Sequence, residues 1–212
     1  MKIALIGASG FVGSAILNEA VRRGHHVTAI VRDVSKVAPH PQVRAMAVDA
    51  QDPQALAEVL KGHDRVISAY NPGWSTPDIH DQYLKGANAI VEAANAAHSW
   101  LLVVGGAGSL EVAPGVQLVD TPEFPAEWKQ GALAARDGLT ALRRETTLDW
   151  RFVSPPVFLE PGEKRGGYRL GGDQVLFSGD QPAGITVSDL ADGVLNEAER
   201  PAHLRQRFTL GY

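Results

Sequence analysis

Residues 2–16 read KIALIGASGFVGSAI, and the order of the parts in this stretch decides the fold. Residues 2–6 form a short apolar run that ends at a glycine, as a buried parallel strand does. In residues 12–23 the apolar side chains recur at helical spacing, and Gly24 offers the helix a stop. A motif of the form G-x-x-G-x-x-G joins the two. The stretch therefore predicts a strand, a tight turn and a helix.

The glycine motif has the composition of a phosphate-binding turn. Glycine permits a tight turn and a close approach of the backbone to a pyrophosphate, and the helix that follows presents unpaired amides. A glycine pattern alone is a weak signal, but a strand before it and a helix after it are the context that a dinucleotide fingerprint requires. The alternative is a turn that binds nothing. We expect cofactor contacts from seven residues, Gly7, Ala8, Ser9, Gly10, Phe11, Val12 and Gly13.

The rest of the chain alternates apolar runs with amphipathic segments. Strands are expected at residues 26–31, 43–48, 65–70, 101–104, 150–153 and 207–210. Helices are expected at residues 52–61, from 77 or 78 to 97, 126–145 and 188–199, with Asp52 and Ser188 as caps. This alternation predicts an α/β fold of the Rossmann type, a doubly wound and mostly parallel sheet, formed by residues 1–212 as a single domain.

The character of the chain changes after residue 155. Glycine, proline and short alternating runs dominate as far as residue 184. Residues 168–170 and 174–177 flank Gly171-Gly172-Asp173, which predicts a β-hairpin. We therefore expect residues 155–187 to form a small, hairpin-containing extension on the substrate side of the sheet.

Composition narrows the class of protein. The formal net charge of the 212 residues is −4, so no basic face is expected for nucleic acid. The chain has no cysteine, which removes thiolate chemistry and fits a reducing cytoplasm, and its histidines show no metal-ligand spacing. No run of 18 apolar residues is present, so no membrane span is expected. A cytoplasmic monomer or homodimer that acts on a small molecule is the expectation.

The end of the second strand bears on the choice of nucleotide. In such folds an acidic residue there bonds the ribose 2′-hydroxyl, whereas an arginine accommodates a 2′-phosphate. Arg32 follows the strand directly, and Lys36 is near enough to assist. We therefore favour NADP(H) over NAD(H). Asp33 is the competing residue and would serve NAD, and a solvated Arg32 is the alternative to phosphate recognition.

Loops at the carboxyl ends of the other strands complete the expected cofactor site. Ligands of open α/β sheets bind outside those ends. The third strand is followed by a pair that would lie near the adenine or would only open the turn to the next helix, and the fourth and fifth strands by loops at the edge of the site. These residues are Asp49, Ala50, Ala69, Tyr70, Asn71, Gly105 and Gly106.

Several stretches together resemble a known family. KIALIGASGFVGSAI at the start, VVGGAGSLEV after the fifth strand and FVSPP after the sixth are similar to the atypical short-chain dehydrogenase/reductase superfamily. They resemble most its NAD(P)H-binding branch of proposed NADH-flavin reductases, which includes relatives of biliverdin-IXβ/flavin reductase and NmrA-like proteins. The resemblance extends to RLGGDQVLF and RQRFTLGY. It implies that Pro155 and Pro156 shape the nicotinamide pocket.

The Tyr-x-x-x-Lys pair of the wider superfamily is missing, because no lysine lies four residues after Tyr70, Tyr83, Tyr168 or Tyr212. This counts against alcohol–ketone chemistry. Hydride transfer to a planar acceptor such as a flavin or quinone needs mainly stacking and positioning. We expect an NAD(P)H-dependent reductase of that kind, with flavin as a passing substrate. An NmrA-like nucleotide sensor without turnover is the main alternative, and a sugar epimerase or isomerase ranks lower.

Four residues are candidates to contact the acceptor. Ser109 is a possible hydroxyl donor, although a serine that stabilises its loop is the commoner case. Trp74 and Phe158 are possible walls for ring stacking, or simply core or surface aromatics. His80 follows Trp74 and would reach a substrate only if the loop turns inward.

Overall fold

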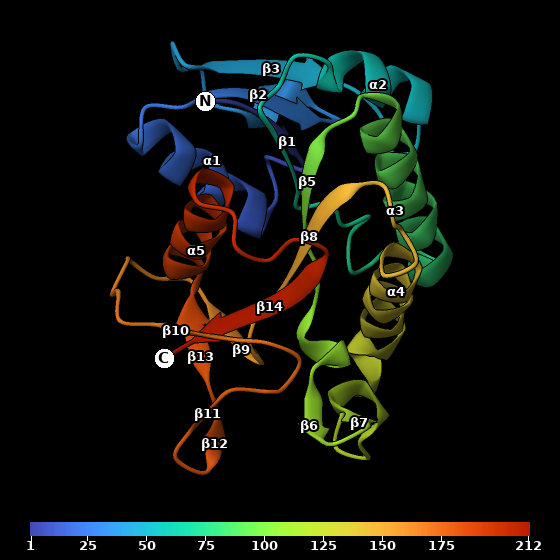
Figure 1. Cartoon of the computed structure of the whole chain (residues 1–212), viewed down its shortest axis with the longest axis vertical. Coiled ribbons are helices and arrows are strands. Elements are labelled where there is room, and N and C mark those ends of the chain that lie inside the picture. Colours follow the sequence, from blue (N-terminus) through green and yellow to red (C-terminus); the bar gives the residue numbers. More distant parts are fainter.

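Eight strands form the central sheet of the computed structural model, which describes residues 1–212 (Figure 1). Their order is β10–β14–β8–β5–β4–β1–β2–β3, and every neighbouring pair is parallel except β10 with β14. The predicted doubly wound Rossmann sheet is thus confirmed. The strands are β1 (Lys2–Ile6), β2 (His26–Val31), β3 (Val43–Ala47), β4 (Arg65–Ser68), β5 (Trp100–Val104), β8 (Asp149–Ser154), β10 (Arg169–Gly171) and β14 (Gln206–Gly211).

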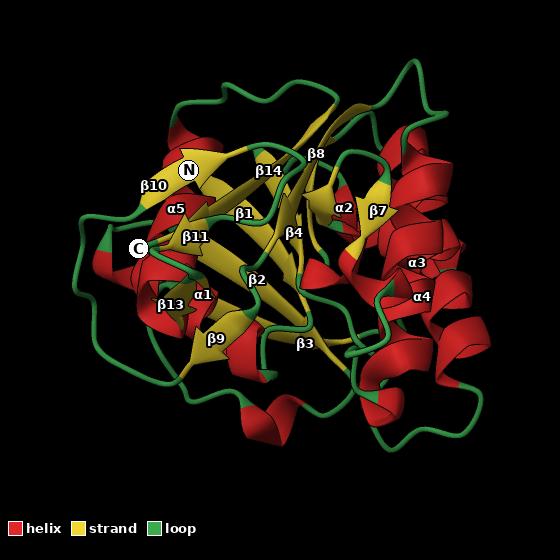
Figure 2. Ribbon diagram, turned by 90° about the horizontal axis from the view of Figure 1, so that it is seen from below, coloured by secondary structure: helices red, strands yellow, loops and turns green.

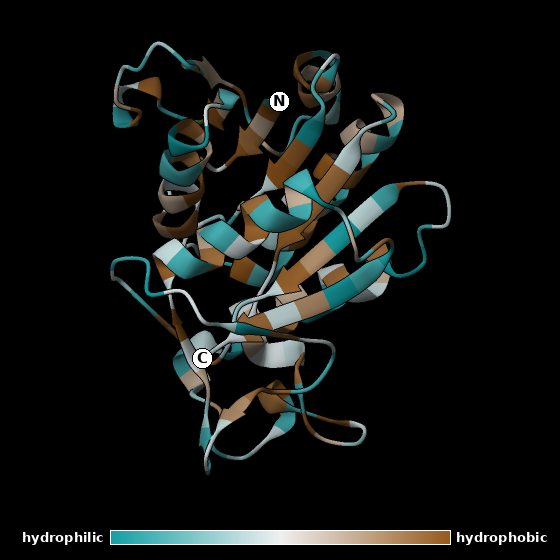
Figure 3. Ribbon diagram, turned by 60° about the vertical axis from the view of Figure 1, so that its left-hand side comes forward, coloured by the Kyte–Doolittle hydropathy of each residue, from teal (hydrophilic) through white to brown (hydrophobic).

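Helices cover both faces of the sheet (Figure 2). One face carries α1 (Phe11–Arg22) and α5 (Val187–Glu199), and the other carries α2 (Pro53–Leu60), α3 (Ile79–Ala96) and α4 (Ala126–Leu142). Alternate residues of β1 enter opposite cores, so Ile3 and Leu5 pack under α1 and α5, whereas Ala4 and Ile6 pack under α2 to α4. The central strands β1 and β5 are accordingly apolar along nearly their whole length, whereas the helices carry both hydrophobic and hydrophilic residues (Figure 3).

Two helix starts show how far local signals reach. The carboxylate of Asp52 accepts hydrogen bonds from the amides of Gln54 and Ala55 at 3.1 and 3.0 Å, so the predicted cap of α2 is confirmed. The predicted cap of α5 is wrong. Thr186 caps that helix by accepting from the amide of Asp189, whereas the hydroxyl of Ser188 donates to the carbonyl of Gly162 at 2.7 Å.

The predicted hairpin between residues 168–170 and 174–177 is not formed. Instead, β10 pairs antiparallel with β14 and extends the main sheet. A different hairpin joins β11 (Phe177–Ser178) to β12 (Gln181–Pro182), and β9 (Phe158–Glu160) pairs parallel with β13 (Gly184–Thr186). The partners of residues 169–171 lie about forty positions away in the chain, which a local pattern does not reveal.

Small elements extend the carboxyl side of the sheet. One antiparallel pair, β6 (Glu111–Ala113) and β7 (Val116–Gln117), follows β5. Figure 1 shows this pair and the β11–β12 hairpin at the lower end of the molecule, toward which β5 and β8 run. Three single turns of 3-10 helix are η1 (Val34–Lys36), η2 (Ala107–Ser109) and η3 (Leu118–Asp120). None of the helices has the length and apolar character needed to cross a membrane.

Candidate functional site

The three glycines of the turn have different physical roles. Gly7 has a φ of +79°, and a Cβ there would lie 2.6 Å from the carbonyl oxygen of Ala69. At Gly13 a Cβ would lie 2.0 Å from the carbonyl oxygen of Gly7, because α1 packs closely on the end of β1. Gly10 is exposed and a Cβ there would come no closer than 3.4 Å to any atom outside its neighbours. The fold itself thus requires Gly7 and Gly13, whereas Gly10 borders an open face.

The start of α1 leaves its first amides free. Gly10 is the N-terminal cap and offers no side chain, and the first backbone bond of the helix runs from the amide of Ser14 to the carbonyl of Gly10 at 2.8 Å. The amides of Phe11, Val12 and Gly13 therefore have no acceptor within the helix. Free amides beside a bare, exposed glycine are a cradle that a side chain would fill and a phosphate would satisfy. The turn fits the pyrophosphate of a dinucleotide.

At the end of β2, Arg32 and Asp33 are in different situations. One carboxylate oxygen of Asp33 accepts hydrogen bonds from the hydroxyl and the amide of Ser35, at 2.6 and 3.0 Å. These bonds hold the pKa of Asp33 below its usual range and use the carboxylate to cap η1. Arg32 is exposed and forms no ion pair, and Lys36, at the end of η1, is exposed as well. The two cations are the groups here that remain free for a ligand.

The residues after β3 and β4 divide between the site and the core. The carboxylate of Asp49 accepts from the amide of Gln51 at 2.9 Å, which is the turn that leads to α2, and Ala50 is buried in the core under the helices. The backbone of Ala69 meets Gly7, as a close approach at the sheet edge requires. Asn71 is exposed and accepts from the amide of Gly73 at 2.7 Å.

The side chain of Tyr70 turns into the helical layer. Its ring occupies the space where a Cβ of Gly86 would stand, and its hydroxyl donates to the carbonyl of Gln82 at 2.9 Å. Burial raises its pKa. Only the backbone of Tyr70, whose amide nitrogen lies near Gly7, remains at the glycine turn. The expected cofactor contact of Tyr70 is therefore restricted to its main chain.

The residues after β5 and β8 that were expected at the cofactor site differ in how closely they are packed. A Cβ on Gly105 would lie 1.9 Å from the ring of Phe152, so this glycine makes room for an aromatic side chain. Gly106, by contrast, has space, with a Cβ no nearer than 3.7 Å to Ala135. Pro155 and Pro156 follow β8 directly and are buried. They form a rigid floor at the carboxyl end of that strand.

Ser109 is held by a residue that the sequence did not single out. It is only 3% exposed, and its hydroxyl accepts a hydrogen bond from Nη1 of Arg207 at 3.1 Å. Arg207 is itself buried and forms an ion pair with Asp173 at 2.5 Å, and burial lowers its pKa. This arrangement favours Ser109 as a residue that fixes its loop. In the sequence, the one sign of a special role for Arg207 is a charged residue within the otherwise mostly apolar strand expected at residues 207–210.

Trp74 and His80 lie on the α3–α4 side of the molecule. Trp74 is 62% exposed and its ring stands where a Cβ of Gly131 in α4 would be. The ring of His80 bonds Asp137 at 3.0 Å and Asp81 at 3.2 Å, and these two carboxylates raise its pKa. No hydrogen bond joins either residue to the glycine turn. Nowhere do three or more histidine or carboxylate side chains gather in a way that would hold a metal ion.

A family model described as NAD(P)H-binding matches residues 7–201 of the chain, which includes the glycine turn, both layers of helices, and Pro155 and Pro156. The chain belongs to this NAD(P)H-binding family. The family is a Rossmann-fold oxidoreductase branch of the atypical short-chain dehydrogenases/reductases, as the sequence motifs predicted.

Close relatives cover the whole chain. The uncharacterised protein YwnB of Bacillus subtilis is 41% identical over 99% of this chain and 98% of its own length. Among solved structures, a proposed epimerase from Bacteroides thetaiotaomicron shares 41% identity with a TM-score of 0.93, covering 100% of this chain and 96% of the other. A proposed NADH-flavin reductase from Streptococcus pneumoniae shares 37% identity with a TM-score of 0.89, covering 100% and 99%.

Proposed function

We propose that this protein is an NADPH-dependent reductase of planar acceptors, such as free flavins or quinones. The observation that carries the proposal is the open glycine turn beside Arg32, which is unpaired while Asp33 is committed to Ser35. Free amides at the start of α1 suit the pyrophosphate, and the guanidinium suits a 2′-phosphate through bidentate bonds. A relative from Streptococcus pneumoniae that carries the name NADH-flavin reductase supports the choice of acceptor.

The residues expected to hold the nucleotide are those of the turn, Arg32 and Lys36 at the adenosine end, and the floor of Pro155 and Pro156 at the nicotinamide end. When bound, the reduced nicotinamide supplies a hydride. The contribution of the protein is to orient the ring and to hold a flat acceptor against it, since fixed geometry removes much of the entropic barrier to a bimolecular step. Rigid prolines at the end of a buried strand suit that role.

No tyrosine is available as a proton relay. The hydroxyl of Tyr70 donates to the carbonyl of Gln82, that of Tyr168 donates to Asp192, and that of Tyr212 donates to Asp189. Tyr83 is buried between α3 and α4, and burial raises its pKa to about 12. An acceptor that takes its proton from water, as a flavin or quinone can, needs no such group. This favours the reductase over an epimerase, the name that the Bacteroides relative carries, since epimerisation needs an acid–base pair.

Exposed apolar side chains on the carboxyl side of the sheet suit a flat acceptor. Phe158 follows the proline floor within two positions and is half exposed. Phe177, on the β11–β12 hairpin, and Val112, on β6, are exposed as well. Single exposed apolar residues are ordinary, but several on the segments that border one edge favour a ring-binding wall.

Turnover of the purified protein tests the proposal. NADPH oxidation is followed with and without FMN, riboflavin and a small quinone, with NADH in place of NADPH as the control. We expect acceptor-dependent oxidation that is faster with NADPH. Tight NADP(H) binding by calorimetry without turnover on any acceptor would contradict the reductase and would favour a nucleotide sensor. A sensor would need no hydroxyl donor for a substrate, and the hydroxyl of the buried Ser109 is bonded by Arg207.

A further inference from the structure

Two of the four tryptophans of the chain are exposed, and both lie at the carboxyl side of the sheet. Trp100 and Trp150 are buried, whereas Trp74 and Trp128 are 62% and 54% exposed. Trp74 is in the loop between β4 and α3, and Trp128 is in the first turn of α4. Figure 1 shows the start of α4 at the same lower end of the molecule as the β6–β7 pair. Open α/β sheets bind their ligands at this edge.

Trp128 lies on the side of α4 that faces the sheet. The residues that follow it at helical spacing on this side are all buried: Ala132, Ala135, Leu139 and Leu142. The last two belong to the core under the sheet, and a Cβ on Gly108 would lie 2.8 Å from that of Ala132. Trp128 is one turn before Ala132 and continues the same stripe, yet it is more than half exposed. The stripe therefore extends beyond the part of α4 that the protein itself covers.

A glycine allows the ring of Trp74 to lie against α4. A Cβ at Gly131 would lie 2.6 Å from Cζ3 of Trp74 and 3.3 Å from Cδ1 of Ile79. Glycine is less favourable than alanine inside a helix, and the packing of the indole explains why one is present here. Gly131 follows Trp128 by three residues, and residues at that spacing are neighbours on a helix surface. The two exposed indoles, the indole pair, therefore meet the same part of α4.

The loop after β5 connects the indole pair with the floor proposed for the nicotinamide. The amide of Gly105 donates to the carbonyl of Val153 in β8 at 2.9 Å, two residues before Pro155. Further along the loop, Gly108 packs on α4 one turn after Trp128. A ring bound at the indole pair would therefore lie at the same edge of the sheet as the nicotinamide.

We propose that the indole pair is the stacking site for the acceptor, and that it selects a fused aromatic ring such as an isoalloxazine over a single-ring quinone. The inference rests on the reductase function proposed above. Two indoles present a large flat apolar area, and the stabilisation from stacking grows with the ring area that is covered. Phe158 follows β8, whereas the indole pair belongs to α4 and the loop after β4, so the two can be tested independently.

Lumiflavin is the probe, because it has the flavin ring system without a ribityl phosphate chain. It is titrated into the full chain in the presence of NADP⁺, and the quenching of its fluorescence reports binding without turnover. We expect saturable quenching, with an affinity about tenfold lower in Trp74→Ala and in Trp128→Ala. Trp128→Phe, which keeps an aromatic ring, should recover most of the affinity. Leu170→Ala, at a position that is 56% exposed on β10, is the control and should not alter it.

Gly131→Ala tests the position of an indole without removing it. The added methyl would meet the ring of Trp74, an exposed side chain that can rotate away, and alanine favours the helix. We expect a melting temperature that is not lowered, together with a several-fold loss of lumiflavin affinity. Gly138→Ala is the matched control in α4, since a Cβ there would lie 3.2 Å from the ring of Tyr83 instead. It should leave the affinity unchanged.

The outcomes for the indole pair and for the reductase are distinguishable. Flavin turnover by the unaltered protein, with lumiflavin affinity unchanged in both tryptophan variants, would overturn the indole pair and leave the reductase standing. Lumiflavin binding that depends on both tryptophans, without NADPH turnover, would support the indole pair and remove the reductase. Absence of lumiflavin binding to the unaltered protein would also overturn the inference. So would self-association of the chain that both alanine variants abolish, because the indoles would then form an interface between two copies.

Discussion

The glycine-turn region, residues 2–31, and the substrate-side segment, residues 155–187, are built by different rules. In the first, a strand, a turn and a helix follow one another in the chain and in space, and the tightest packing of the turn is that of Gly13 on Gly7. The backbone of Ala69 is a distant contact that adds to it. In the second, β9 pairs with β13 and β10 pairs with β14, so these strands find their partners far along the chain, and the β11–β12 hairpin is the local exception. The first region is readable from local pattern, and the second is not.

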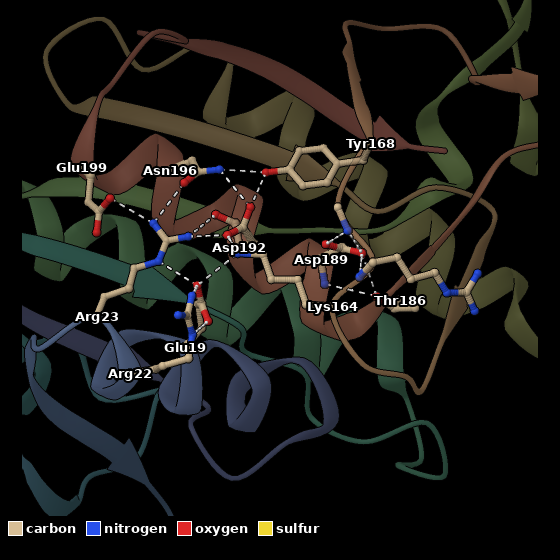
Figure 4. A network of polar contacts seen from close by, with 12 residues as sticks. Glu19, Arg22, Arg23, Lys164, Tyr168, Thr186, Asp189, Asp192, Asn196 and Glu199 are labelled. Carbon is tan, nitrogen blue, oxygen red and sulfur yellow. Dashed lines mark hydrogen bonds and ion pairs between the residues drawn. The ribbon is translucent and has the colours of Figure 1, made fainter.

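A polar network joins the two regions (Figure 4). Asp192 of α5 lies at its centre and accepts from Arg23, after α1, at 2.6 Å and from Tyr168, in the substrate-side segment, at 2.7 Å. Lys164 of the same segment pairs with the same carboxylate. Nearby, Asp189 accepts from the amides of Arg165 and Gly166 at 2.8 and 3.0 Å. The segment is thus anchored to the glycine-turn helix through α5, although its own strands are short.

The largest effect is expected where the glycine-turn region has no room. In Gly13→Val the Cβ would lie 2.0 Å from the carbonyl oxygen of Gly7. Relief of this clash would require the backbone of the turn to move, which costs much more free energy than the rotation of a side chain. We expect a loss of about 4 kcal/mol in the free energy of unfolding, measured by urea titration. Gly172→Ala, in the substrate-side segment with no atom within 4 Å of a Cβ, is the control. Equal stability of the two variants would mean that the turn is not tightly packed.

Breaking the junction should cost less. Asp192→Ala leaves Arg23 and Lys164 without their shared carboxylate, and we expect a loss of about 3 kcal/mol in unfolding free energy. Exposed Asp180, on the loop of the β11–β12 hairpin, provides Asp180→Ala as the control. A loss below 1 kcal/mol at Asp192, judged against the usual range for surface ion pairs of about 0–1 kcal/mol, would mean that the network adds little.

The same carboxylate predicts a pH dependence. Burial raises the pKa of Asp192, but the bonds from Lys164 and Tyr168 and the charge of Arg23 outweigh it, so the pKa in the folded state is lowered. Its contribution is then complete above the unfolded pKa, near about 4, and is lost as the pH falls below that value toward the folded pKa. Unfolding free energy should drop less steeply below about pH 4 in Asp192→Asn than in the unaltered protein. Parallel pH curves for the two would contradict the assignment.

Contacts between residues that are close in the chain were predictable from the sequence, whereas contacts between distant residues were not. Asp52 was recognisable as a cap because its partners are two and three residues away. Thr186, the cap that was missed, is fixed by a tertiary contact, since its hydroxyl also accepts a hydrogen bond from the hydroxyl of Tyr212. Tyr70 was assigned to the cofactor from its position after β4. Its ring instead packs in the helical layer, in the space that the absent Cβ of Gly86 leaves open. In each case the deciding partner is distant in the chain and carries no periodic signal.

Gly10→Val tests the functional face of the turn, as distinct from its packing. A Cβ at Gly10 would come no closer than 3.4 Å to the atoms around it, but the side chain would occupy the space in front of the free amides of α1. We expect nucleotide affinity to fall by about 100-fold, measured by calorimetry, with a melting temperature close to that of the unaltered protein. Retained affinity would remove the pyrophosphate from this turn.

Arg32→Ala should alter selectivity more than affinity. Loss of a charged, bidentate partner for a 2′-phosphate should weaken NADPH by about tenfold and leave NADH almost unchanged. Asp33→Ala is the matched variant at the neighbouring position, where the carboxylate serves Ser35, and it should not shift the preference toward either nucleotide. An equal loss of NADPH and NADH in Arg32→Ala would mean that the arginine does not read the phosphate.

The smallest effect on stability, and one specific to the acceptor, is expected at Phe158 in the substrate-side segment. Its ring is 51% exposed and follows the proline floor, so Phe158→Ala should change the unfolding free energy by less than about 1 kcal/mol. The KM for the flavin should rise several-fold while the KM for NADPH stays the same, because the proposed function assigns this ring to the acceptor and not to the nucleotide. Leu204→Ala, 53% exposed and next to the opposite end of β14, is the control and should alter neither. If the flavin KM is unchanged in Phe158→Ala, the acceptor wall lies elsewhere on the carboxyl side, and the exposed rings of Phe177 and Trp74 become the next positions to substitute.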